Sequence, residues 1–462
     1  FKIKKNTVVK RLSLLLISAG CVISLYFGLQ TESFRKLIGF PEGLFRIYVT
    51  TQNNGLFPGF IYKMKYLIVD KPDGYSAAAE KKILDETKIN EEKSGDYPDI
   101  IVIMDEAFSD PAVDADFNVN EDYMPFIHSL EDNGENVITG YINTSVNGGN
   151  TPNTEFEFLT GNSMAFLPEG SIPYQSYVTR SIDNLAAYMN SLGFYSIAMH
   201  PYLASGWDRE TVYPLFGFNE SHFLDYFELF SPEYVRNYVS DSSLFKQIEY
   251  ELENRSDKNR PVFSFNVSMQ NHSDYDGDPE NFERRILVDG LDEDDKYVKR
   301  LDNYLSLIRY TDDAFREMTE YYSNSGRKTI IVLFGDHQPS ASVLRKIYEL
   351  NGSDYENLSE EETLNLYRVP FVIWANYDIE EQSGIETSVN YLGNLVLKSA
   401  GIPLTRYRTF TEEFRERFPI ISAIRFVNSE GDSLFSSQKG NKLDDYAKMQ
   451  YYELFDDRDD YE

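Results

Sequence analysis

The chain has 462 residues, which is enough for one large domain or two ordinary ones. Its 75 acidic residues outnumber its 44 Lys and Arg, and the net charge of −31 repels phosphate polyanions, which excludes a general nucleic-acid binder. Hydrophobic residues make up 42% of the chain, so a substantial core can form. The single cysteine, Cys21, excludes an internal disulfide framework and a cysteine-rich zinc site.

Residues 1–30 predict a transmembrane helix with a basic cytoplasmic flank. An uncharged apolar stretch runs from Leu12 to Leu29, about long enough to cross a bilayer core. The positive-inside rule places the preceding basic residues on the cytoplasmic side and everything after residue 30 outside. The basic residues are Lys2, Lys4, Lys5, Lys10 and Arg11. A cleaved signal peptide is the alternative, but the stretch is long for one and no clear cleavage site follows. The initial Phe suggests a fragment in which this span is the last of several.

Residues 31–95 predict a membrane-proximal connector. Its first half mixes basic and aromatic residues around Gly and Pro, which fits either an amphipathic segment at the membrane surface or a helix packed on the main domain. Its second half indicates a turn, a solvated charged helix and a linker.

The pattern of residues 96–427 predicts an α/β domain with a mostly parallel central sheet flanked by helices. Short apolar runs alternate with helical patterns such as 181–193 and 304–326, as expected for such a sheet. The runs are 100–104, 137–142, 195–199, 262–269, 329–334 and 370–375. We expect all six to deliver polar residues to one edge, at the carboxyl ends of the strands. Residues 428–462 form an acidic tail that we expect to be peripheral or mobile.

Thr151 is the first residue of interest, in the stretch "NGGNTPNTEFEFLTGN" that begins at Asn147. Threonine is a favoured helix N-cap, and the proline that follows it suits the first helical position. Taken alone, the stretch therefore indicates a cap, and a nucleophile is the alternative.

Two further candidates follow apolar runs. Glu106 comes after 100–104, beside Asp105, and Asp336 with His337 comes after 329–334. Carboxylates and an imidazole together suit Zn²⁺ or Mn²⁺. An acidic helix start and a polar turn are the alternatives.

Three more polar residues follow the runs 195–199 and 262–269, namely His200, Arg209 and His272, and Trp207 lies beside Arg209. Arginine binds phosphate in bidentate fashion, and His and Trp can flank a polar head group. For each of these residues taken alone, an ordinary loop residue is the favoured interpretation. The remaining histidines, His128 and His222, lie in helical or loop context, and we assign them no role.

These residues fit one mechanism. A threonine hydroxyl is hardly ionised near neutral pH, and a bound divalent metal favours its alkoxide. Glu106, Asp336 and His337 could hold that metal, with Thr151 as a fourth ligand. A helix starting at Thr151 would point its positive end at an incoming phosphate.

Five motifs in this order resemble the extracellular domain of the lipoteichoic acid synthases and related phosphoglycerol transferases, in the sulfatase and alkaline phosphatase superfamily. They are "IIVIMDEAFSD", "GGNTPNTEFEFLTGNS", "HPYLASGWDRE", "VSMQNHSDY" and "LFGDHQPS". The resemblance implies that Glu106, Thr151, Asp336 and His337 bind one divalent metal ion, Mn²⁺ first, with Zn²⁺ or Mg²⁺ as alternatives, and that Thr151 is the nucleophile. It also implies that His200, Trp207, Arg209 and His272 bind the glycerol phosphate group.

The resemblance further implies a phosphatidylglycerol donor, a glycolipid, teichoic acid or polysaccharide acceptor, and a cell-membrane location with the catalytic domain extracellular. A phosphoethanolamine transferase or a sulfate ester hydrolase of the same superfamily is an alternative. Sulfatases need a Cys or Ser at the nucleophile position, where this chain has Thr151. From another class, a catalytically inactive cell-surface binding protein also stays open.

Overall fold

The computed structural model describes residues 5–40, 49–66, 69–89, 95–292, 295–435 and 441–456. It divides into two compact units, Phe1–Asp70 with Ser205–Asp208, and Lys71–Ala204 with Arg209–Glu462. The boundaries predicted at residues 30, 95 and 427 stay predictions. Lys2, Lys4 and parts of the predicted connector, linker and tail (41–48, 67–68, 90–94, 436–440 and 457–462) lie outside the described residues.

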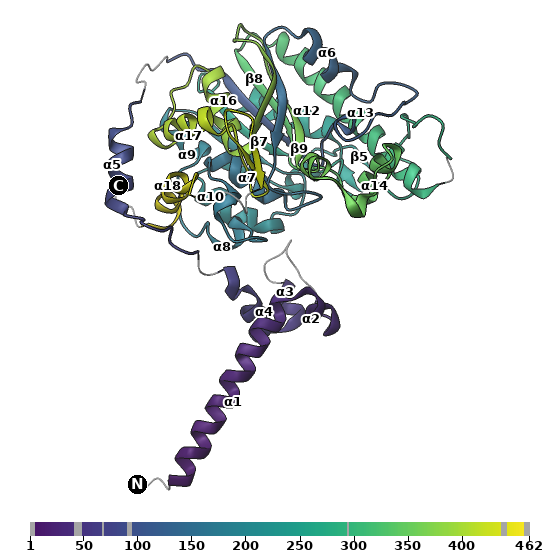
Figure 1. The fold of residues 1–462 in the computed structure, drawn as a ribbon. Coiled ribbons are helices and arrows are strands. Elements are labelled where there is room, and N and C mark those ends of the chain that lie inside the picture. Colours follow the sequence, from purple (N-terminus) through teal and green to yellow (C-terminus); the bar gives the residue numbers. More distant parts are fainter. Residues whose placement is uncertain are drawn as a thin grey trace. The chain divides into compact units, whose positions relative to one another are not determined.

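The smaller unit begins with one long apolar helix, α1 (Lys5–Gln30) (Figure 1). Its segment Val8–Gln30 is long and apolar enough to cross a membrane, and only 6% of its most apolar window is buried. In the described residues between 31 and 70, this unit also contains α2 (Glu32–Leu37), α3 (Val49–Asn54), α4 (Leu56–Lys63) and the 3₁₀ turn η1 (Met64–Tyr66).

The larger unit contains an eight-stranded sheet in the order β10-β2-β9-β8-β1-β7-β3-β4. The strands are β1 (Asp99–Asp105), β2 (Val137–Asn143), β3 (Tyr195–Met199), β4 (Glu220–His222), β7 (Val262–Val267), β8 (Thr329–Gly335), β9 (Arg368–Ala375) and β10 (Gln382–Ser388). Neighbouring strands are parallel except at β9, which is antiparallel to both β2 and β8. The predicted fold class is thus confirmed, and all six apolar runs are strands.

Two expectations about the sheet were wrong. Because β9 runs against its neighbours, its carboxyl end points to the opposite edge, so five of the six runs and not all six end at the same edge. His222 is not in helical or loop context but in the short edge strand β4.

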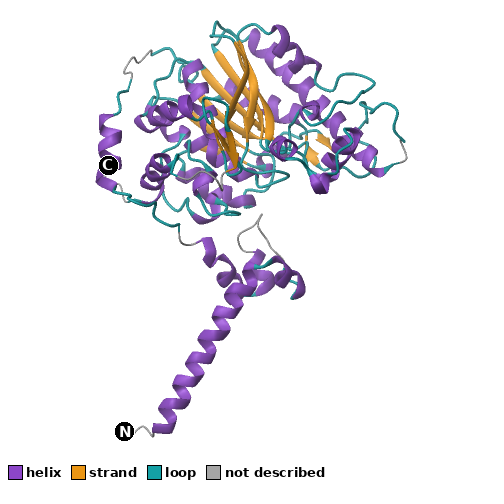
Figure 2. Ribbon diagram, in the orientation of Figure 1, coloured by secondary structure: helices purple, strands orange, loops and turns teal. Residues whose placement is uncertain are grey.

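Helices cover both faces of the sheet (Figure 2). The remaining helices of at least five residues are α5 (Ala77–Glu86), α6 (Pro125–Asn133), α7 (Thr151–Thr160), α9 (Leu185–Ser191), α10 (Arg209–Leu215), α11 (Leu224–Glu228), α12 (Asp241–Asn254), α13 (Lys296–Ser323), α14 (Ala341–Leu350), α15 (Glu360–Asn365), α16 (Val389–Ser399), α17 (Arg406–Arg417) and α18 (Asp444–Phe455). Side chains alternate between the faces of a strand. Ile101 and Ile103 of β1 accordingly join one core cluster with α12, α13 and α14, whereas Phe265 and Phe334 contact Phe158 of α7.

Short peripheral elements complete the larger unit. They are the four-residue helix α8 (Pro173–Ser176), the hairpin β5 (Tyr234–Val235) with β6 (Tyr238–Val239), and the small sheet of β11 (Ile420–Ile421), β12 (Arg425–Val427) and β13 (Ser433–Phe435). The 3₁₀ turns there are η2 (Pro111–Val113), η3 (Met164–Phe166) and η5 (Tyr355–Asn357), and η4 (Gly206–Asp208) groups with the smaller unit.

Within the predicted acidic tail, α18 is not peripheral, because it packs into a core cluster. Tyr446 and Met449 are fully buried there, together with Leu84 of α5. Gln450 also accepts the Ser163 N–H and donates to the Ser163 carbonyl, at 2.8 and 2.9 Å. The prediction relied on the acidic composition and overlooked the tyrosines and Met449, whose burial drives this packing. Helix α5, expected to be a solvated charged helix, likewise buries Leu84.

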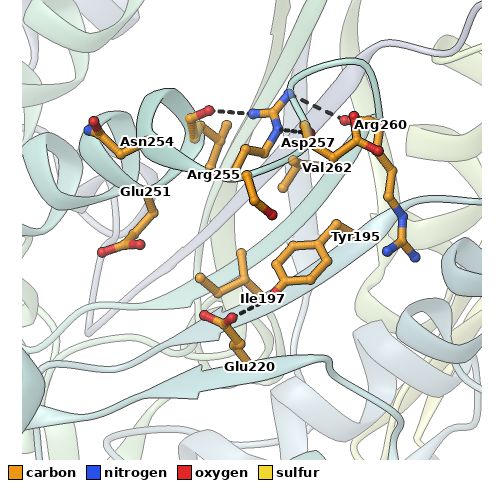
Figure 3. A pocket seen from close by; sticks show the side chains of 11 residues that line it. Tyr195, Ile197, Glu220, Glu251, Asn254, Arg255, Asp257, Arg260 and Val262 are labelled. Carbon is orange, nitrogen blue, oxygen red and sulfur yellow. Dashed lines mark hydrogen bonds between the residues drawn. The ribbon is translucent and has the colours of Figure 1, made fainter.

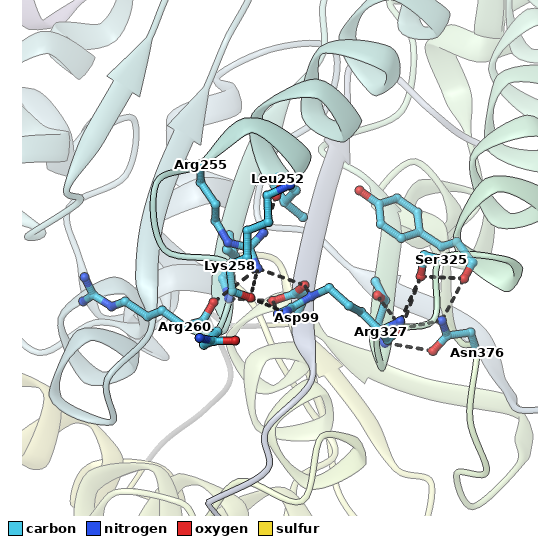
Figure 4. Close-up of polar contacts among 12 residues, drawn as sticks. Asp99, Leu252, Arg255, Lys258, Arg260, Ser325, Arg327 and Asn376 are labelled. Atoms are coloured by element: carbon cyan, nitrogen blue, oxygen red, sulfur yellow. Dashed lines mark hydrogen bonds and ion pairs between the residues drawn. The ribbon is translucent and has the colours of Figure 1, made fainter.

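The amino-terminal edge of the parallel strands is held by a buried carboxylate. Asp99 accepts two bonds from Arg327, at 2.6 and 2.8 Å, and one from the Val262 N–H, which joins β1 to β7 (Figure 4). A cavity of about 350 Å³ lies at this edge, lined by residues such as Tyr195 and Arg260 (Figure 3). None of the predicted site residues lines it, and Arg260 bonds the backbone carbonyl of Gly193.

Candidate active site

Thr151 is the first residue of α7, a helix whose ten residues are all buried. The N-cap position belongs to Asn150, which has left-handed backbone angles (φ 64°) and makes no side-chain cap bond. The cap interpretation of Thr151 was therefore wrong by one residue. Gly148 and Gly149 lead into the turn with φ of 64° and 148°, angles that favour glycine. The hydroxyl of Thr151 is consequently available for another role, and the side chain is 6% exposed.

Glu106, Asp336 and His337 converge at the carboxyl edge of β1 and β8. One ligand atom from each lies within 4.8 Å of the others, and all three residues are buried. His337 Nε2 is 3.1 Å from Asp336 Oδ2 and 3.7 Å from Glu106 Oε1. Parallel pairing of β1 with β8 places Asp105 opposite Gly335, so each strand delivers its next residue to the same point. The sheet thus brings together three of the four predicted metal ligands.

The donor atoms of this cluster suit a divalent metal. The His337 Nδ1–H donates to the Gln338 carbonyl at 2.8 Å, which leaves the lone pair on Nε2. His337 Nε2 and Asp336 Oδ2 are buried, and neither has a hydrogen-bond partner among the described residues. The other oxygen of Asp336 accepts the Ala107 N–H at 2.8 Å, which fixes the carboxylate. Two carboxylates, an imidazole and a nearby hydroxyl fit Mn²⁺, Zn²⁺ or Mg²⁺.

The pKa of Glu106 links the cluster to Thr151 and Arg209. Burial and the neighbouring Asp336 raise this pKa to about 8, while His337, Arg209 and a hydrogen bond from Thr151 lower it. Thr154, three residues further along α7, donates its hydroxyl to the Asp336 carbonyl at 2.7 Å, so the start of this helix lies beside the cluster. An uncompensated negative charge at this depth is costly, and a metal cation would offset it.

Arg209 is almost fully buried, at 1% exposure, and its donors are shared between two partners. Its Nε and Nη2 donate to Oε1 of Glu155. The other oxygen of this carboxylate, Oε2, accepts the hydroxyls of Tyr174 and Tyr213. Its Nη1 donates to Nε2 of His200 at 3.1 Å. The His200 Nδ1–H donates to the Val267 carbonyl, so this ring is held neutral, and burial with the Arg209 charge lowers its pKa well below the usual value.

His272 faces the same cluster from the loop after β7. Its Nδ1 lies 2.6 Å from the Ser273 carbonyl and 3.0 Å from the Tyr238 hydroxyl. Burial lowers the pKa of His272, whereas the Ser273 bond and the charge of Asp336 raise it. Arg236 holds the loop by donating to the carbonyls of Gln270 and His272.

Trp207 is the predicted site residue that does not group with the larger unit. It lies in Ser205–Asp208, which belongs to the smaller unit, and its φ of 57° is left-handed. His128 lies in α6, as its helical context predicted, and its Nδ1 contacts Asp122.

Sequence reasoning missed Glu155 and Asn271, and it noted Asp105 only as the neighbour of Glu106. The Asn271 side chain donates to Asp105, the residue before Glu106, at 2.8 Å. Glu155 has one local signal, since it lies with Glu157 among the phenylalanines of a helix in which every position is buried. Its partner Arg209 is 54 residues away, and no local pattern shows that pairing.

These elements define an α/β domain with a candidate divalent-metal centre and a threonine at the start of an adjacent helix. A sulfatase family model matches residues 98–402. The chain therefore belongs to the sulfatase family, and its relatives confirm the resemblance to the lipoteichoic acid synthases and phosphoglycerol transferases of the alkaline phosphatase superfamily.

Sequence relatives include a putative cyclic beta-1,2-glucan modification protein of Rhizobium meliloti, 30% identical over 88% of this chain and 62% of that protein. Lipoteichoic acid synthase 1 of Bacillus subtilis is 26% identical over 59% of this chain and 42% of its own length. The chain thus spans less than two thirds of each of these relatives.

Solved structures share the fold. The phosphoglycerol transferase GacH of Streptococcus pyogenes, in complex with sn-glycerol-1-phosphate, has a TM-score of 0.65 at 21% identity and covers 83% of this chain and 94% of its own. The lipoteichoic acid synthase LtaP of Listeria monocytogenes has a TM-score of 0.58 at 18% identity, over 81% of this chain and 97% of its own.

Proposed function

We propose that the chain is a membrane-anchored phosphoglycerol transferase that moves glycerol phosphate from phosphatidylglycerol to an acceptor in the cell envelope. The observation that carries this proposal is Thr151, which begins a buried helix beside the cluster of Glu106, Asp336 and His337. A phosphoryl group arriving there would meet a hydroxyl, the positive end of α7 and, by way of Arg209, a buried cation.

In the first step, the Thr151 oxygen forms a bond to phosphorus while the bond from phosphorus to the diacylglycerol oxygen breaks. The proton of Thr151 leaves with diacylglycerol, and glycerophosphate stays on the threonine. In the second step, the oxygen of an acceptor hydroxyl forms a bond to phosphorus while the bond from phosphorus to the Thr151 oxygen breaks. The acceptor's proton passes to Thr151, and the free enzyme returns. A divalent metal, Mn²⁺ first, would favour ionisation of the threonine and offset charge on the phosphoryl oxygens.

Four further side chains complete the proposal. Arg209 and His200, locked to each other, and His272 would orient the glycerol phosphate, since a fixed guanidinium and imidazole lose little freedom on binding. Trp207 would flank the head group. The apolar helix α1 would anchor the chain in the cell membrane, with residues 96–427 as the extracellular catalytic domain.

We place a glycan first among the acceptors. The relative named for modification of a cyclic glucan matches 88% of this chain, against 59% for lipoteichoic acid synthase 1, so the better-matched relative is the one named for a glycan. A glycan hydroxyl and the terminal hydroxyl of a glycerol phosphate polymer are chemically alike, so both belong in the test.

The test is to incubate the full chain in vesicles with labelled phosphatidylglycerol and Mn²⁺, and to follow diacylglycerol release and label on protein. Thr151→Ala should lower release by more than about 1,000-fold and abolish protein labelling, because the nucleophile is lost. Thr160→Ala is the matched control, since it removes a hydroxyl at the other end of the same helix, where Thr160 donates to the Phe156 carbonyl and accepts the Asn162 N–H.

Equal diacylglycerol release by Thr151→Ala and the parent would refute the nucleophile. Release by the parent without label transfer to either a β-glucan or a glycerol phosphate polymer would refute the transfer step and leave a hydrolase. The same assay with labelled phosphatidylethanolamine in place of phosphatidylglycerol tests the phosphoethanolamine transferase alternative. Faster diacylglycerol release from phosphatidylethanolamine would favour that alternative.

A further inference from the structure

The smaller unit exposes large apolar side chains in two segments that follow α1, at positions 37–38 and 56–64. They are Leu37, Ile38, Leu56, Phe57, Phe60 and Met64, which are between 40% and 81% exposed, and we call them the apolar collar. Large exposed apolar groups in one small unit are unfavourable in water and mark an interaction surface. The question is which partner covers them.

Helix α4 is apolar on two opposite sides. Leu56, Phe57 and Phe60 fall within about 100° of the helix circumference at 100° per residue, and Met64 continues the same side. Ile61 and Tyr62 lie on the other side and are 1% and 2% exposed. The side with Ile61 and Tyr62 therefore belongs to the core of the smaller unit. The side with Leu56, Phe57 and Phe60 is not covered by that core.

The buried side of α4 fixes where this helix lies along α1. Ile61 and Tyr62 form one cluster with Leu29, against which Leu25 and Tyr26 of α1 also pack. Leu25 precedes the end of α1 at Gln30 by five residues, or about 7.5 Å along the axis. Helix α4 is thus level with the last turns of α1.

The junction between α1 and α2 is closely packed, so the position of α4 relative to α1 is fixed by contacts. The Phe34 ring lies against Gly28, where a Cβ would come within 2.9 Å of it. Arg35 donates to the Leu29 carbonyl at 2.8 Å and lies over the Tyr62 ring at 5.5 Å. The collar is therefore held at the carboxyl end of α1.

We infer that the apolar collar is a lipid-binding surface that inserts into the outer leaflet of the bilayer that α1 spans. Interfacial helices bury their apolar side about 5–10 Å into the boundary between head groups and acyl chains, which is the depth that packing on the last turns of α1 imposes. The exposed Lys36, next to Leu37, suits the head groups of an anionic lipid. The inference rests on the proposed membrane anchor, and it does not depend on the transfer reaction.

The test uses the full chain, with Cys21→Ala as background because Cys21 is the single cysteine. Single cysteines replace Phe60 in the collar, Leu15 in the middle of α1, and Asp354, an exposed residue of the larger unit. Each variant is spin-labelled and reconstituted into vesicles of phosphatidylcholine and phosphatidylglycerol. Collision rates are measured with oxygen, which concentrates in lipid, and with a nickel chelate present on both sides of the membrane.

The label at Phe60 should collide with oxygen and be shielded from nickel, at a depth of about 5–10 Å below the phosphates. The label at Leu15 should be deeper, and the label at Asp354 should be open to nickel. Nickel access at Phe60 equal to that at Asp354 would overturn the inference, and so would shielding of Phe60 from both reagents, which means a protein partner. Nickel access at Leu15 would instead refute the anchor.

Discussion

At the residue scale, the side chains of the candidate site have their other hydrogen-bonding positions already occupied by the backbone. His337 offers Nε2 because Nδ1–H is committed to a backbone carbonyl, and Asp336 offers one oxygen because the other holds a backbone N–H. Thr151 has no cap bond to make because Asn150 occupies the cap position. His337, Asp336 and Thr151 can therefore each offer one donor atom to the candidate metal site.

Glu155 is the residue whose removal best tests how Arg209 is positioned. Glu155→Gln keeps the shape but removes the charge that orients the guanidinium, so kcat/KM for phosphatidylglycerol should fall about 100-fold, since small displacements of a positioning group have effects of that size. The affinity for metal, measured by calorimetry, should stay unchanged, because Glu155 does not contact the metal cluster.

Tyr174→Phe is the matched control for that variant. It removes one neutral hydrogen bond to the same carboxylate and leaves the Arg209 pair intact, so the loss in kcat/KM should be small. A Glu155→Gln protein that is less stable, yet when folded has the parent's kcat and KM, would mean that Glu155 only supports the fold.

At the element scale, the parts of the fold that could be predicted are those with a local pattern. The long strands were found because each is a continuous apolar run buried on both faces. β4 and β10 were missed because they are edge strands that are partly exposed and polar. The direction of β9 could not be predicted, because it depends on which strands β9 pairs with in the folded sheet, and the sequence of β9 does not show this.

The site divides in the same way. Asp336 and His337 could be predicted because they follow a recognisable strand, and their meeting with Glu106 follows from the parallel pairing of β1 and β8. The cap position shifted by one residue because left-handed angles at Asn150 leave no sequence signal. The pairing of Glu155 with Arg209 exists only once α7 and α10 are packed together.

The carboxyl end of α7 supplies a prediction about pH. Burial raises the pKa of Glu157 from 4.5 to about 7, although its Oε1 accepts bonds from Ser145, Ser163 and the Met164 N–H. Between these two pH values the unfolded chain releases a proton that the folded chain keeps, so Glu157 makes the folded state less stable as pH rises. Its share of the loss is about 3 kcal/mol.

Urea unfolding from about pH 5 to pH 8 measures this effect. The stability of Glu157→Gln relative to the parent should increase as pH rises, because the variant has no proton to lose. Glu210→Gln, at an exposed position, is the control, and its free energy of unfolding should change with pH in the same way as that of the parent. A constant difference between Glu157→Gln and the parent across this range would contradict the raised pKa.

At the scale of the whole molecule, both the net charge and the candidate metal site contribute to the binding of Mn²⁺. A chain with a net charge of −31 attracts divalent cations to its entire surface, so binding of Mn²⁺ alone says little about a specific site. A specific site differs because it binds only the folded state and because its ligands must first lose their protons.

Thermal unfolding separates the two kinds of binding. Mn²⁺ at 100 times its dissociation constant should stabilise the parent by about 2.7 kcal/mol. Asp336→Asn changes the net charge by one unit in 31 yet removes a central ligand, so its unfolding temperature should barely respond to Mn²⁺. Because burial raises the pKa of Glu106 to about 8, the metal must displace a proton at neutral pH, and the shift should grow as the pH approaches 8. Equal, pH-independent shifts in the parent and in Asp336→Asn would mean that the cations bind the acidic surface and that the cluster holds no metal.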